Sequence, residues 1–146
     1  MATDDGSAVV EFVLVAIVML VPLVYLLVAV AVVQRNQIAV TNAAREAGRA
    51  FATSTTPAEA DARVAAAIRL ALDSQHVPDD VEVRFVAAGG DCDSAQAPPS
   101  LMPGTQFTVC VQRRVTVPGV PHVLSGRGIR AVGRYVVHVD EFRTPG

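Results

Sequence analysis

Residues 8–33 read AVVEFVLVAIVMLVPLVYLLVAVAVV, and this stretch decides how the chain is built. Its 26 residues include one charged side chain, that of Glu11. A helix needs about 20 apolar residues to cross the hydrocarbon core of a bilayer. A cleaved secretory signal has a basic start and an apolar region of only about 7–15 residues, and this segment has neither feature. We therefore predict a membrane-spanning helix.

The composition limits what the rest of the chain can be. The protein has 146 residues, of which 51% are hydrophobic and 18% charged, whereas average soluble domains are about 45–50% apolar and about 25% charged. The excess lies in the apolar segment, and about 110 residues remain for one small domain. The net charge is −2, and every basic residue apart from histidine is Arg. Without a strong basic field, we predict no nucleic-acid partner.

Two residues interrupt the apolar segment. A carboxylate such as Glu11 costs about 2.5–3.5 kcal/mol at the bilayer centre and is usually paired there. Because Glu11 lies near the start of the segment, its side chain could instead reach the water interface. Pro22 lacks a backbone N–H, and we predict that it kinks the helix or loosens one turn.

The run GSAVVEF at residues 6–12 resembles the processing site of type IV pilin-like precursors. The residues that carry the resemblance are Gly6, Ser7, Glu11 and Phe12. It implies that a prepilin peptidase cuts between Gly6 and Ser7 and leaves Glu11 as the fifth residue of the mature chain. The cut exposes a new ammonium on Ser7, which Glu11 of a neighbouring subunit can neutralise.

The run TNAAREAGRA at residues 41–50 resembles the segment that follows the membrane helix in TadE-like proteins, the pseudopilins of tight-adherence pili. Residues 34–51 contain no proline and are rich in alanine, so we predict that the helix continues beyond the membrane. The resemblance implies a minor pilin-like subunit of a pilus or secretion apparatus that contacts other pilin-like subunits through its N-terminal helix. Arg45 and Arg49, with Glu46 nearby, also fit an ordinary solvated helix face.

Charge and cysteines give opposite indications of orientation. The leader, residues 1–5, has two acids and no Lys or Arg, whereas Arg35 follows the apolar segment, so the positive-inside rule alone places the C-terminal domain in the cytoplasm. Cys92 lies among turn formers and Cys110 in a predicted strand. A bridge between them would add about 3 kcal/mol of stability in an oxidising compartment. Two separate buried thiols and half of a metal site are the alternatives. We predict a single-pass protein of the bacterial cell membrane, in contact with lipid, whose C-terminal domain is extracytoplasmic.

The predicted fold is α+β, with a long N-terminal membrane helix that continues outward and a second, amphipathic helix packed on a small antiparallel sheet of about three strands. Thr56, Pro57 and Glu59 form a capping-box start for the second helix, which runs to about Ser74. Alternation of apolar and polar residues predicts strands at 81–86, 107–112 and 135–139. We divide the chain into a leader at 1–6, a membrane and juxtamembrane helix at 7–55, and an extracytoplasmic domain at 56–146. Arg113 and Arg114 are predicted to form a solvated strand edge.

Catalytic and metal-binding patterns are weak in this sequence. Ser125, His122 and Asp140 supply the residue types of a hydrolase triad but no nucleophile-elbow pattern. The histidines fall at no ligand spacing, and Asp91 and Asp93 lack the other oxygen ligands of a calcium loop. We therefore predict no enzymatic activity, no metal and no cofactor.

Two functions remain open. The first is an assembly subunit, which requires removal of residues 1–6 and depends on Glu11. The second is an uncleaved, membrane-anchored extracytoplasmic binding module, which is indifferent to both.

Overall fold

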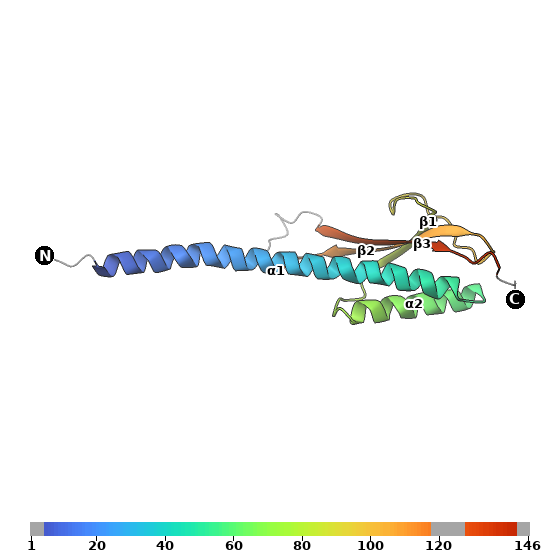
Figure 1. Cartoon of the computed structure of the whole chain (residues 1–146), viewed down its shortest axis with the longest axis horizontal. Coiled ribbons are helices and arrows are strands. Elements are labelled where there is room, and N and C mark those ends of the chain that lie inside the picture. The colour runs from blue at the N-terminus through green and yellow to red at the C-terminus, as the bar shows by residue number, and fades with distance from the viewer. Residues whose placement is uncertain (1–4, 118–127, 143–146) are drawn as a thin grey trace. The chain divides into compact units, whose positions relative to one another are not determined.

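The computed structural model describes residues 5–117 and 128–142, with side chains from residue 9 onward (Figure 1). It contains two helices and one antiparallel sheet, so the predicted α+β class is confirmed. The elements are α1 (Asp5–Ala52), α2 (Pro57–Asp73), β1 (Glu82–Ala87), β2 (Gln106–Val115) and β3 (Ile129–His138).

The chain divides into two compact units, one ending at Val32 and the other beginning at Val33. The second unit includes the C-terminal half of α1, because that half has a buried face. Its fully buried residues recur at spacings of three and four, which places them on one side of a helix. They are Ala39, Val40, Ala43, Ala44 and Ala47.

The second helix begins as its sequence predicts, with one difference. Thr56 is the N-cap, and its Oγ1 accepts a hydrogen bond of 3.2 Å from the backbone N–H of Glu59. The carboxylate of Glu59 accepts bonds from the backbone N–H and the hydroxyl of Thr55, at 2.8 and 2.6 Å, rather than from the N–H of Thr56. Thus the reciprocal bond of the capping box is displaced by one residue toward the N-terminus.

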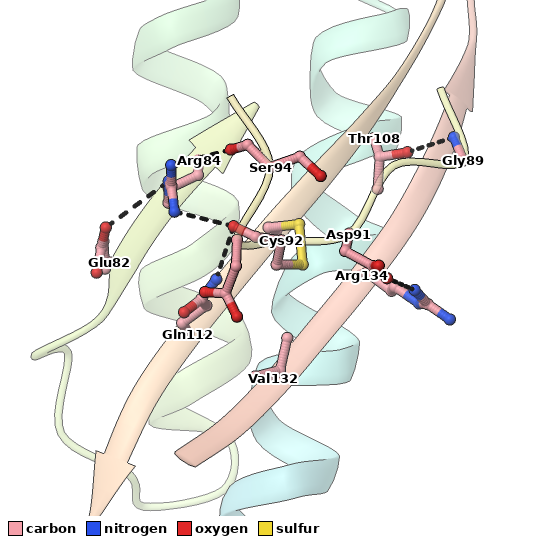
Figure 2. Close-up of a disulfide and its surroundings, with 12 residues drawn as sticks. Glu82, Arg84, Gly89, Asp91, Cys92, Ser94, Thr108, Gln112, Val132 and Arg134 are labelled. Atoms are coloured by element: carbon pink, nitrogen blue, oxygen red, sulfur yellow. Dashed lines mark hydrogen bonds and ion pairs between the residues drawn. A yellow bond between two sulfur atoms is a disulfide. The ribbon is translucent and has the colours of Figure 1, made fainter. Parts of the chain in front are cut away.

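The strands follow the order β1-β2-β3, and both neighbouring pairs are antiparallel. One face of the sheet packs on the helices, where the ring of Phe51 on α1 contacts those of Phe85 and Phe107 at centroid distances of 6.1 and 4.9 Å. A loop between β1 and β2 covers the other face. Figure 2 shows this loop and its disulfide in front of the strands, with both helices behind them. The central strand β2 is therefore buried on both sides.

Two strands are longer than predicted. The prediction ended β2 at Gln112 and began β3 at Tyr135, but the two strands pair as far as Val115 with Ile129. The charged residues of this region obscured the alternation. Gly133 also weakens a strand pattern, and its reason is structural: a Cβ at this position would lie 2.0 Å from the carbonyl oxygen of Val40 on α1. Glycine is thus the residue that lets α1 approach β3.

Candidate functional site

The N-terminal half of α1 presents a long apolar surface. From Val9 onward the helix contains an 18-residue window with a mean hydropathy of 3.1, and no part of that window is buried. Its large side chains are open, for example Phe12 at 75% and Met19 at 69% exposure. Isolated exposed apolar residues are ordinary, but a contiguous surface of this kind marks a membrane or protein contact. The helix is long and apolar enough to span a bilayer.

Glu11 is the one charge on this surface between Val9 and Gln34. Its side chain is exposed, and in the described part of the chain no basic group pairs with it. A carboxylate within an apolar segment is stabilised by a cation or by water at the interface. Glu11 is therefore available to a positive group supplied by another molecule.

The remaining N-terminal residues singled out by sequence lie on the same helix. The backbone of Gly6 and Ser7 falls within α1, while the side chain of Ser7 is outside the described residues. Pro22 also lies inside α1, and the helix continues through it without interruption. The carbonyl of Val18 lacks the hydrogen bond that an N–H at position 22 would donate. The kink at Pro22 stays a prediction.

The comparisons with known proteins bear on this same segment. The family described as TadE-like protein matches residues 6–49. Residues 6–49, the TadE-like segment, are therefore similar to this family. The match begins at Gly6 and extends past the apolar surface into the part of α1 that packs on the sheet. No curated protein and no solved structure matches the chain.

The TadE-like segment ends inside the second unit, where polar contacts join it to β3. Gln37 donates from Nε2 to the carbonyl of Val132 at 2.8 Å, and its Oε1 accepts from the Val132 N–H at 3.3 Å. Gly48 faces the Tyr135 ring, which a Cβ would approach to 2.5 Å. Sequence reasoning missed both contacts. Gly48 and Gly133 could have indicated these close approaches, since glycine inside a helix or strand often marks close packing. Nothing in the sequence singled out Gln37.

Cys92 and Cys110 form a disulfide, as one of the sequence alternatives predicted. The bond joins the loop after β1 to the centre of β2, where both cysteines are buried with Val86. Arg84 donates from Nη1 to the Cys92 carbonyl at 2.9 Å, and Gln112 donates to the same oxygen at 3.2 Å (Figure 2). The loop is thus held to the strands by two side-chain hydrogen bonds to this carbonyl in addition to the disulfide.

Ion pairs hold the same loop on its exposed side. Asp93 accepts from Arg130 at 2.6 Å and Asp91 from Arg134 at 3.2 Å. All four side chains are more than half exposed, so each pair contributes only about 0–1 kcal/mol. Asp91 and Asp93, the two aspartates that could have suggested a calcium loop, therefore pair with arginines.

The strand edge predicted at Arg113 and Arg114 is wrong, although Arg114 is exposed as expected. Both residues belong to β2, which is the central strand, and the Arg113 side chain is only 12% exposed. Its guanidinium donates from Nε to Asp80 at 2.7 Å and from Nη1 to the buried Asn36 of α1. The side chain of Arg113 lies on the face of the sheet that packs on the helices, so it joins α1 to the sheet rather than protecting an edge.

The structure describes only some of the candidate metal ligands and triad residues. No group of three or more His, Cys, Asp or Glu side chains that could hold a metal occurs within residues 9–117 and 128–142. His122 and Ser125 lie outside the described residues, whereas Asp140 is exposed and accepts a bond from the Phe142 N–H at 2.9 Å.

Proposed function

We propose that this chain is a pilin-like structural subunit, a minor pseudopilin, of a tight-adherence-type pilus or secretion apparatus. A prepilin peptidase removes residues 1–6, and the mature chain assembles with other pilin-like subunits through the exposed apolar surface of α1. The observation that carries the proposal is that this apolar surface lies within the TadE-like match, which starts at Gly6. The proposal includes no catalytic activity.

The proposed role of Glu11 follows from its surroundings. Cleavage after Gly6 would create an ammonium on Ser7, four residues before Glu11. Glu11 has no basic partner within the described chain, and the apolar side chains around it disfavour an unpaired charge. In an assembly, the Ser7 ammonium of one subunit would pair with Glu11 of the next, so both charges would be neutralised away from water.

The proposed orientation rests on the disulfide. Such bonds persist in oxidising compartments outside the cytoplasm. This disulfide joins Cys92 and Cys110 within the second unit. The protein would thus cross the cell membrane once and display residues 33–146 on the outside.

The first experiment is intact-mass analysis of the protein recovered from its native membranes, in cells that have an active prepilin peptidase. We expect a chain that begins at Ser7, and Gly6→Ala should leave the full-length chain. Val28→Ala is the matched control, because it trims the same apolar surface far from the cleavage site. A wild-type chain that retains residues 1–6 would contradict the proposal and favour an uncleaved, membrane-anchored binding module.

The second experiment separates assembly from processing. Glu11→Gln keeps the size of the side chain and removes its charge, so the variant should be cleaved yet fail to enter assemblies isolated from the cell surface. Incorporation at the wild-type level would show that charge neutralisation by Glu11 is not required.

A further inference from the structure

The outer edge of β3 is incompletely covered. Both backbone groups of Val132 point away from β2, because Gln37 bonds them from α1. Backbone groups alternate in direction along an antiparallel strand, so those of Arg134 and Val136 also point outward. No donor or acceptor among the described residues bonds these two positions.

The opposite edge of the sheet, along β1, is covered near Phe85. Residues 96 and 97 lie against β1, where Gln96 bridges to Val86 and the Ala97 N–H donates to the Phe85 carbonyl at 2.9 Å. An unpaired strand edge is a template for another chain, and proteins usually cover it. Here the Phe85 carbonyl on the β1 edge and both backbone groups of Val132 on the β3 edge have partners, but Arg134 and Val136 are open.

A basic groove runs beside this open edge. It has a volume of about 580 Å³ between α1 and β3, and its lining includes Arg45, Arg49 and Arg134 but only one carboxylate, that of Glu46. Glu46 lies 3.7 Å from Arg49, and both side chains are more than half exposed, so this pair is weak. Arg45 has no ion-pair partner among the described residues. Arg134 pairs with Asp91, outside this lining, at 3.2 Å, and this exposed contact is also weak, so the excess positive charge of the groove is that of Arg45.

We infer that the β3 edge at Arg134 and Val136 binds an extended polypeptide segment with carboxylate side chains, which adds to the sheet as a further strand. Main-chain bonds to the two open positions would supply affinity, and pairing with Arg45 would select acidic sequences. This inference goes beyond the proposed function and does not depend on it. The edge and the groove lie within residues 33–146, so neither cleavage nor membrane insertion decides the outcome.

The test uses the full chain in detergent micelles and a synthetic seven-residue peptide that alternates valine with aspartate. We expect the peptide to slow hydrogen exchange at the amides of Arg134 and Val136, by about tenfold when its concentration is ten times Kd. A peptide with lysine in place of aspartate should bind more weakly. No added protection at these two amides, or equal binding of the two peptides, would overturn the inference.

Variants at one position provide a matched pair. Val136→Pro removes an outward N–H that β2 does not use, and a proline is tolerated at an edge in that orientation. It should weaken binding of the aspartate peptide at least about tenfold, since a donor is lost and the ring obstructs the added strand. Val136→Thr keeps the N–H and should bind as the wild type does. Equal affinity of the two variants would overturn the inference, and the exchange measurement on the wild type stands even if the proline variant fails to fold.

Discussion

The side-chain amide of Gln37 bonds both backbone groups of Val132, donating to the carbonyl at 2.8 Å and accepting from the N–H at 3.3 Å. The amide thereby takes the place of a neighbouring strand at this point of the β3 edge. Each such bond contributes about 0.5–1.5 kcal/mol. The pair therefore joins the TadE-like helix to the sheet at a position that sequence patterns do not reveal.

Replacing Gln37 tests the value of this contact. Gln37→Ala should lower the free energy of unfolding by about 1–2 kcal/mol, because both backbone groups of Val132 lose their partner. Urea unfolding of the full chain in mild detergent, followed by circular dichroism, measures the loss. Gln34→Ala is the control, since Gln34 is exposed on the same helix and makes no hydrogen bond that the structure describes. Equal losses in the two variants would contradict this role of Gln37.

Gly133 sets how closely α1 approaches the sheet. A Cβ there would lie 2.0 Å from the carbonyl oxygen of Val40, and backbone atoms cannot rotate away as a side chain can. Gly133→Ala should therefore cost about 2–3 kcal/mol, as overpacking in a core does. Thermal unfolding measures this loss.

Gly48→Ala provides the comparison. Its Cβ would meet the ring of Tyr135 and a methyl of Val137, which are side chains that can shift. We expect a smaller loss than at Gly133. A larger loss at Gly48 would show that the Val40 backbone adapts more readily than the Tyr135 ring.

The local parts of this fold could be predicted from sequence because their causes are local. The uniform apolar run gives the long helix, the Thr56-Pro57 start gives α2, and alternation gives the centre of each strand. The fold class rests on these patterns, the TadE-like resemblance rests on the runs at residues 6–12 and 41–50, and both are confirmed.

The contacts between distant segments could not be predicted in the same way. Arg113 looks like a residue of a solvated edge, and only the register places it on the face next to Asn36. The alanine face of α1 is a similar case, because it is buried only once the sheet is present. A regular helix pattern does not tell which half of the helix meets another element.

The capping contact of Glu59 predicts a pH dependence. Hydrogen bonds from the side chain and then the backbone of Thr55 lower the pKa of Glu59 from 4.5 to about 2. Because the folded-state pKa is below the unfolded value, the stabilisation is fully present above pH 4.5 and is lost as the pH falls toward 2. Glu59→Gln should therefore make the free energy of unfolding fall less steeply as the pH decreases from 4.5 toward 2.

The matched variant is Asp61→Asn, which removes one negative charge from an exposed position of the same helix. Urea unfolding at a series of pH values between 2 and 5 compares the two variants with the wild type. Glu59→Gln should reduce the slope of stability against pH more than Asp61→Asn does. Equal slopes in the two variants would show that the bonds to Thr55 are not retained in solution.

The disulfide stabilises the loop face of the sheet. It closes a segment with a sequence separation of 18, which corresponds to about 3 kcal/mol of loop-closure entropy in the unfolded chain. Replacing Cys92 and Cys110 together by serine should lower the free energy of unfolding by about this amount. The strands and helices should remain, because the Phe51 cluster lies on the opposite face. Reductant should cause the same loss in the wild type and none in the double variant, which separates the covalent bond from the packing of the cysteines.

The same cysteines report the orientation in cells. If residues 33–146 lie outside the cytoplasm, both thiols are bonded, so a maleimide reagent should modify the denatured chain only after reduction. Modification without reduction would place the domain in a reducing compartment and would support the orientation that the acidic leader and Arg35 indicate. The loop would then be held on the sheet by noncovalent contacts, among them the bonds from Arg84 and Gln112 to the Cys92 carbonyl.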